Sequence, residues 1–289
     1  NSIEGFSLTP ILVLPYLKSL SFEIRSDKES LAFMEQIKHF LTYRQPCLTQ
    51  GRIKIICPDM FPDKGTKTNI QTFINLVSTI ENNEHSQTWE ITSEKHEFIL
   101  EYFIQQLHSN IDNLKLEFQS SPQTNASIKC SQIIDLINVW KVKKSFSLTC
   151  DELLFDTKLN TVSQKLEEVH LVLKDELKTF TGDLFECFLR RIISNQLNIF
   201  SVQTQDCSNN YEIVHRVLKT LENSPKLAQL TFNLNAEDIS VEEATKIMDK
   251  LNESEVSAKI ILKLMRLPVA MSAGILVKKH KSNLIVNIV

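Results

Sequence analysis

The residues with the clearest potential for chemistry lie in the polar loop from Asp59 to Lys67, which follows the apolar run Arg52 to Cys57. Lys64-Gly65-Thr66-Lys67-Thr68 resembles the end of a phosphate-binding loop. A functional loop of this kind needs a glycine, four further residues and then Gly-Lys-Ser/Thr, so that successive backbone amides wrap a phosphate. Only one glycine is present here and no lysine follows it directly. The pattern therefore favours an ordinary polar turn, and we expect no nucleotide cofactor.

Histidines are the second group with chemical potential, and they are isolated from one another in the sequence. The seven are His39, His85, His96, His108, His170, His215 and His280. His96-Glu97 does not extend into the zinc motif H-E-x-x-H because position 100 is leucine. No group of cysteines and histidines has the spacing of a zinc site. We expect no metal ligands in this chain.

Six cysteines are scattered without any C-x-x-C pair: Cys47, Cys57, Cys130, Cys150, Cys187 and Cys207. Such spacing favours buried free thiols in a reducing compartment over a disulfide framework. A catalytic cysteine-histidine pair stays open, because such partners meet only in space, but nothing singles out one cysteine. The sequence thus predicts no catalytic residues and a protein that is not an enzyme.

Charge and hydropathy limit the kinds of partner that the chain is expected to bind. The chain has 289 residues, 32 basic and 35 acidic, and a net charge of −3. Basic and acidic residues are interspersed along the chain, so no basic stripe marks a nucleic-acid site. The longest apolar run, Leu267 to Val277, is about half the roughly 20 residues of a membrane span. We expect no membrane span and a cytoplasmic location, while Lys278-Lys279-His280-Lys281 leaves a nuclear one open.

The elements that would position any site repeat along the chain. Leu227 to Asn235 alternates apolar and polar residues like a strand, Ala236 to Ile239 forms a polar corner, and Val241 to Leu251 has helical apolar spacing. Similar strands recur at intervals of about 29 residues. The first residue facing the core in each expected strand is Leu20, Ile53, Trp89, Leu114, Phe146, Val169, Phe200, Leu230, Ile260 and Leu284.

Helices are expected between these strands. Their ranges are 28–43, 69–81, 94–110, a helix holding Ile133 to Trp140, a less regular one over 151–166, then 180–194, 211–221 and 241–251. One strand with one helix cannot enclose a core, so neighbouring units must cover each other. The prediction is an α/β curved solenoid, a horseshoe of about ten strand-helix units with a parallel inner sheet and outer helices.

The strand at Leu227 also carries a family resemblance. Leu227-x-x-Leu230-x-Phe232-x-x-Asn235 resembles the L-x-x-L-x-L-x-x-N signature of ribonuclease-inhibitor-type leucine-rich repeats. Looser copies are Leu17/Leu20/Phe22, Ile111/Leu114/Leu116/Gln119, Leu166/Val169/Leu171 and Leu197/Phe200/Val202/Gln205. Only one unit keeps the asparagine, and the family's helix-entry glycine is missing, so the repeats are degenerate. The resemblance covers nearly all of residues 1–289, which we expect to form a single domain and a fragment of a longer chain.

The resemblance implies a non-catalytic protein-protein interaction domain. Similar irregular repeats form the recognition part of F-box-type ubiquitin ligase receptors and of nucleotide-binding innate immune receptors. Strand positions that alternate with the core residues would face a partner protein on the inner surface. The candidate partner-binding residues are Glu23, Lys54, Glu90, Lys115, Glu117, His170, Gln203 and Asn233.

Two other organisations remain open from the sequence. One is an α/β enzyme with a doubly wound sheet and an unidentified active site, whose ligand would lie at the carboxyl ends of the strands. Strand order distinguishes it from a solenoid, because a doubly wound sheet reverses its order. The other is a pair of α/β domains divided near the polar loop Ser120 to Ser127.

Overall fold

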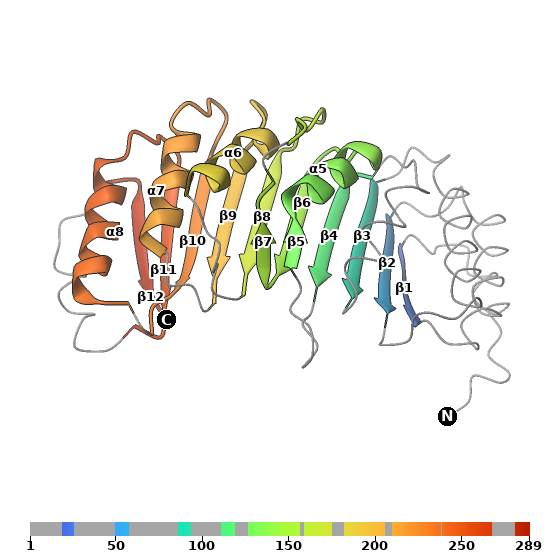
Figure 1. The fold of residues 1–289 in the computed structure, drawn as a ribbon, viewed down its shortest axis with the longest axis horizontal. Coiled ribbons are helices and arrows are strands. Elements are labelled where there is room, and N and C mark those ends of the chain that lie inside the picture. The colour runs from blue at the N-terminus through green and yellow to red at the C-terminus, as the bar shows by residue number, and fades with distance from the viewer. Residues whose placement is uncertain are drawn as a thin grey trace, which may run out of the picture.

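A parallel sheet with its strands in chain order organises the molecule (Figure 1). The computed structural model describes residues 19–25, 50–57, 86–93, 111–118, 127–156, 159–174, 182–205, 210–237, 239–267 and 281–289. Within them the sheet runs β1 (Ser19–Arg25), β2 (Gln50–Cys57), β3 (Ser86–Ser93), β4 (Asn113–Phe118), β6 (Ser145–Cys150), β8 (Glu168–Leu173), β9 (Ile199–Thr204), β10 (Gln229–Asn235), β11 (Lys259–Met265) and β12 (Leu284–Ile288). The class is mixed α/β with an open sheet, and β1 and β12 are its edges.

An apolar row crosses all ten strands at one level of the pairing. It consists of Phe22, Ile53, Trp89, Leu114, Phe146, Val169, Phe200, Leu230, Ile260 and Leu284. The expected markers therefore align except the first, because Leu20 pairs with Gly51 and Phe22 stands beside Ile53. From Leu114 to Leu284 every member is buried. Pleating sends alternate residues to opposite faces, so this row defines the core side of the sheet.

Within the described part of the chain, four helices lie on that core side (Figure 1). They are α5 (Cys130–Val139), α6 (Gly182–Ile192), α7 (Asn210–Leu221) and α8 (Val241–Glu253). Each buries a stripe at helical spacing, as Ala244, Ile247, Met248 and Leu251 do in α8. These stripes and the strand residues form one continuous core, in which Trp140 and Phe232 are fully buried.

Capping and charged residues stabilise the ends of the helices. Ser240 caps α8 by accepting a hydrogen bond from the Glu243 amide at 3.1 Å. Acidic residues occupy the first turns of α6, α7 and α8, and basic residues occupy their last turns. This placement opposes the partial charges at helix termini. The three helices are therefore expected from their own sequences and agree with the predicted ranges to within a few residues.

The segment after β6 corrects the sequence analysis, which expected a helix over 151–166. The chain instead forms β7 (Glu152–Leu154), which pairs in parallel with β5 (Ser127–Lys129), and the described residues that follow have no helix. The Asn138 side chain of α5 forms hydrogen bonds with the backbone of this irregular segment. Its amide oxygen accepts from the Ser163 amide at 2.7 Å, and its amide nitrogen donates to the Thr161 carbonyl at 3.0 Å. Hydrogen bonds to a side chain of a neighbouring helix thus hold this segment in place of helical hydrogen bonds.

Four other expectations lie outside the described residues. These are the helices 28–43, 69–81 and 94–110 and the phosphate-loop-like residues 64–68. The polar loop proposed as a domain boundary lies between β4 and β5, and Ser127 belongs to β5. Strands β4 and β6, on either side of that loop, pair directly within one sheet.

Candidate partner-binding face of the sheet

The face of the sheet turned away from α5–α8, called here the opposite face, collects the positions predicted for partner binding. Register places them in two neighbouring cross-strand rows. The first row is Glu23, Lys54, Glu90, Lys115, Ser147, His170, Ser201, Thr231, Ile261 and Ile285. The second is Arg25, Ile56, Thr92, Glu117, Thr149, Val172, Gln203, Asn233, Lys263 and Asn287. All eight predicted residues belong to these two rows.

Charges alternate in sign at the β1–β4 end of the first row. Register aligns Glu23 with Lys54, Lys54 with Glu90 and Glu90 with Lys115. Neighbouring strands lie about 4.8 Å apart, so each lysine position has a glutamate position beside it. On β4 the half-buried Lys115 and Glu117 also approach each other, with Nζ and Oε2 3.8 Å apart. The register therefore places residues of opposite charge at neighbouring positions across β1–β4.

The centre of the first row joins a histidine to a serine. His170 and Ser201 are register partners on β8 and β9, and Nδ1 of His170 lies 2.7 Å from Oγ of Ser201. Nε2 of His170 lies 3.6 Å from Oε2 of Glu168 on the same strand. A hydroxyl, an imidazole and a carboxylate that contact one another in this order have the composition of a serine nucleophile with its base and its orienting group.

Acyl transfer also needs amide donors that stabilise the developing oxyanion. Ser201 lies in the middle of β9, which pairs with β8 on one side and β10 on the other. Its neighbouring backbone amides are therefore used in the sheet, and no helix begins beside it. Within the described residues, the three side chains form a polar link across two strands, and the amides next to Ser201 bond within the sheet rather than facing a possible oxyanion.

Two positions expected to face outward are less accessible than the alternation predicted, and a third has one buried polar atom. Thr149 and Thr231 are each only 8% exposed. The side-chain oxygen of Asn233 is buried and has no hydrogen-bond partner within the described residues. The Asn233 residue as a whole is half-buried, as Gln203 and His170 are.

Aliphatic side chains on the opposite face were missed by the sequence analysis. Val172, Ile199 and Ile261 are half-buried there, and Ile285 is 40% exposed. They escaped notice because they sit in runs such as Lys259 to Met265, in which apolar residues occupy consecutive positions. Strict alternation counted from the buried Ile260 and Leu262 would have assigned Ile261 to the opposite face.

Buried thiols and imidazoles elsewhere do not form a reactive site in the described part of the chain. Burial raises the pKa of the free Cys130 and Cys150 thiols far above the usual value, which removes the thiolate needed for attack. His215 stacks on Tyr211 with ring centroids 6.2 Å apart, and burial followed by the Lys250 charge lowers its pKa. No group of three or more potential metal ligands occurs among the described residues.

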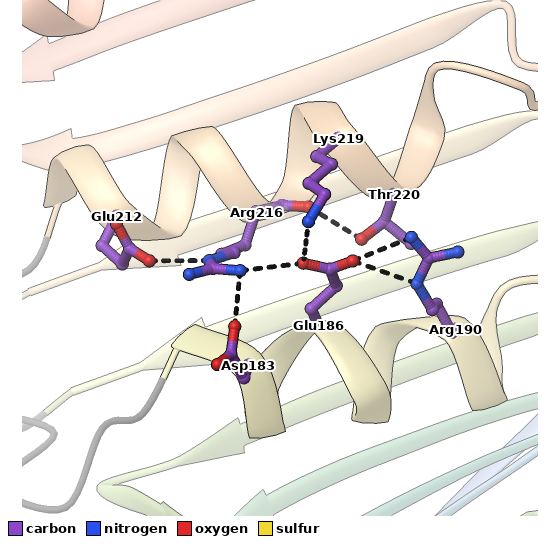
Figure 2. A network of polar contacts seen from close by, with 7 residues as sticks. All are labelled: Asp183, Glu186, Arg190, Glu212, Arg216, Lys219 and Thr220. Atoms are coloured by element: carbon purple, nitrogen blue, oxygen red, sulfur yellow. Dashed lines mark hydrogen bonds and ion pairs between the residues drawn. The ribbon is translucent and has the colours of Figure 1, made fainter.

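The helix side has its own cluster of polar residues, which joins α6 to α7 (Figure 2). Glu186 accepts hydrogen bonds from Arg190 at 2.8 Å and from Arg216 and Lys219 at 3.0 Å. Arg216 also bonds Asp183 at 2.8 Å and Glu212 at 2.6 Å. Three cations thus meet three carboxylates, so the cluster is neutral overall and stabilises the helix pair.

Gly182 leaves room for this cluster at the start of α6. A Cβ atom added there would lie 2.3 Å from Oε1 of Glu212 and 2.7 Å from Nε of Arg216. The missing side chain therefore lets the Glu212–Arg216 pair lie across the end of the neighbouring helix.

Comparison with protein-family models, curated proteins and solved structures gave no match to this chain. Among the described residues, the helices are too short or too polar to cross a membrane. Arguments about function therefore rest on the two faces of the sheet.

Glu186→Gln tests the cluster on the helix side. Burial alone would raise the Glu186 pKa, but hydrogen bonds from Arg190, Lys219 and Arg216 outweigh it and lower the pKa from 4.5 to about 2. This difference contributes about 3 kcal/mol to the free energy of unfolding above pH 4.5, and the contribution is lost as the pH falls from 4.5 towards 2. We expect Glu186→Gln to lower stability at pH 7 by roughly that amount and to flatten the acid dependence, as measured by urea unfolding at several pH values.

The matched control is Glu242→Gln on α8, whose carboxylate is paired with Lys246 at 2.7 Å but is largely exposed. Solvent screens that pair, so we expect little change in unfolding. Equal acid dependence in Glu186→Gln and the unmodified protein would contradict the assigned role of Glu186.

Proposed function

We propose that this chain is a leucine-rich-repeat-like horseshoe that binds another protein through the opposite face and catalyses no reaction. The observation that carries the proposal is the strand order, in which each strand of the main sheet pairs with its neighbours in the chain. A doubly wound enzyme sheet would reverse that order at its ligand site. The concentration of predicted polar positions in two rows on the face without α5–α8 adds support.

Curvature is the physical reason for a horseshoe. Adjacent strands are about 4.8 Å apart, whereas packed helices need about 8–10 Å between their axes. Where a helix accompanies successive strands, as from α6 to α8, the outer layer must be longer than the sheet beneath it. An array of such units bends with the sheet inside, which presents the opposite face as a concave surface.

The signature residues support the resemblance. Leu227, Leu230 and Phe232 are buried, as the leucines of such repeats are. Asn235 stands at the turn after β10, where its side-chain oxygen accepts from the Glu237 amide at 3.4 Å and its carbonyl accepts from Asn210 at 3.3 Å. The asparagine thus joins its own turn to the start of α7.

The proposed partner is another protein, and the proposed context is the recognition part of an intracellular adaptor or receptor of the F-box or nucleotide-binding innate immune kind. This context rests on the resemblance of the repeats. The mixed and partly apolar composition of the two rows fits a polypeptide, because interface cores combine aliphatic contacts with a moderate number of hydrogen bonds. The free thiols Cys130, Cys150 and Cys187 agree with a reducing compartment.

A hydrolase is the second candidate, and the Glu168–His170–Ser201 group is the observation that favours it. Binding is preferred over hydrolysis because Ser201 lacks oxyanion donors and lies on an extended strand within the sheet. Serine nucleophiles of α/β hydrolases instead stand on a sharp turn between a strand and a helix.

Small-angle X-ray scattering tests the horseshoe. A compact domain of 289 residues has a radius of gyration of about 19 Å. We expect a larger value and an asymmetric pair-distance distribution with a long tail, because the units extend along one curved axis. A symmetric distribution with a radius of gyration near 19 Å would favour a closed globule.

Binding through the opposite face is tested with a random peptide display library selected on the unmodified protein. We expect Lys115→Glu combined with Gln203→Arg to weaken the selected binders at least about tenfold, because both substitutions alter charge within the two rows. The control Glu242→Lys with Lys246→Glu exchanges an exposed ion pair on α8 and should leave affinity unchanged. Binders that respond only to the α8 exchange would place the binding surface on the helix side.

A fluorophosphonate probe tests the hydrolase candidate, since it labels serines activated by a base. We expect no labelling of Ser201 at neutral pH, measured by mass spectrometry of the intact protein. Labelling that disappears in Ser201→Ala and in His170→Ala would overturn the non-catalytic proposal.

A further inference from the structure

Two lysines and two isoleucines form a distinct patch at the β11–β12 end of the opposite face. This lysine patch consists of Lys259, Ile261 and Lys263 on β11 and Ile285 on β12. Both lysines are exposed, Ile261 is half-buried and Ile285 is 40% exposed. Ile261 and Ile285 are register partners, so the two aliphatic side chains adjoin.

The lysines of the patch have no acidic neighbours in the sheet. Lys259 pairs with Gln229, and Lys263 stands between Asn233 and Asn287. On β9 and β10 the other positions of this face are Ile199, Ser201, Gln203 and Thr231, none of them acidic. Within the described residues neither lysine has an ion pair, in contrast to Lys115 beside Glu117. The patch is therefore positive on a protein whose net charge is −3.

Spacing in the patch matches an extended chain. Lys259, Ile261 and Lys263 occupy alternate positions of one strand, so the two lysine Cα atoms are about 13 Å apart. A partner segment in extended conformation presents its own side chains with the same period. An acid, an apolar residue and a second acid at alternate positions would therefore meet lysine, isoleucine and lysine in turn.

We propose that the lysine patch binds an extended acidic segment of a partner protein with the pattern acid-x-apolar-x-acid. The proposal rests on the proposed function and adds the chemistry of the partner. Lys259 and Lys263 supply two charge-assisted contacts, and Ile261 with Ile285 covers the apolar residue between them. A nucleic acid fits less well, because phosphates repeat without apolar gaps and the same face carries Glu117 and Glu168.

The direct test uses a fluorescent peptide with the core Glu-Ser-Leu-Ser-Glu between neutral flanks, measured by fluorescence anisotropy at low and moderate salt. We expect saturable binding to the unmodified protein that weakens with salt. Lys259→Glu with Lys263→Glu should weaken it at least about tenfold, and Lys259→Gln with Lys263→Gln should weaken it less. The matched control Lys143→Glu with Lys165→Glu makes the same charge change at exposed loop positions and should retain most of the affinity.

Two further probes separate pattern from charge. A peptide of the same composition with the order Glu-Glu-Leu-Ser-Ser should bind more weakly, because its acids cannot reach both lysines. Equal binding of the two peptides, or equal binding to the Lys259→Glu/Lys263→Glu variant, overturns the proposal. Displacement by a single-stranded oligonucleotide of matched charge at a lower concentration than the peptide also overturns it, in favour of a polyanion site.

Failure of the lysine-patch proposal can be distinguished from failure of the proposed function. If display-selected binders lose affinity for the Lys115→Glu/Gln203→Arg variant but ignore Lys259→Glu/Lys263→Glu, the opposite face binds partners and the lysine patch does not. If they ignore both variants, both proposals fail. Circular dichroism of each variant, compared with the unmodified protein, tests whether a loss of binding comes from unfolding.

Discussion

Burial of one side of strands β4 to β12 against the helices is the constraint on which the described structure depends. The row from Leu114 to Leu284 is apolar at each of its seven positions, and a register shift of one residue would exchange it with the row that contains Lys115 and His170. Such a shift would bury charges and expose the core at the same time. The pairing of strands β4 to β12 is therefore set by which residues can lie on the side of α5–α8.

The two surfaces that result carry charge in different ways. On the helix side, carboxylates and cations are concentrated around the poorly exposed Glu186, whose side chain is 9% exposed, and they balance each other. On the opposite face, register places residues of alternating charge along β1–β4, mostly neutral polar groups beside Glu168 and His170 in the centre, and lysines on β11. A self-balanced cluster favours cohesion between helices, whereas unmatched charge beside exposed isoleucine favours contact with another molecule.

Much of this arrangement could be predicted from alternation and helical spacing alone. The ten strands of the main sheet and the helices α6, α7 and α8 were expected within a few residues, because each has a clear period and α8 has a capping serine, whereas the short strands β5 and β7 were not predicted. The helix predicted over 151–166 was wrong. Hydrogen bonds from Asn138 in another element hold that segment, and its own periodicity does not reveal them. Cross-strand neighbours such as Lys54 and Glu90 depend on the register between strands that are distant in the sequence. The sequence therefore predicted which face of the sheet each residue occupies, but not which residue lies beside it.

The side-chain bonds that link successive helices and turns have a consequence for how the chain reaches this state. They join residues about one strand-helix step apart, such as Asn138 to Ser163, Asp183 to Arg216 and Glu237 to Arg266, with separations of 25, 33 and 29 positions. Closing a loop of that length costs nearly the same entropy at every step. Assembly can therefore start at one well-packed stretch and spread outward in either direction, without first bringing the two ends of the polypeptide together.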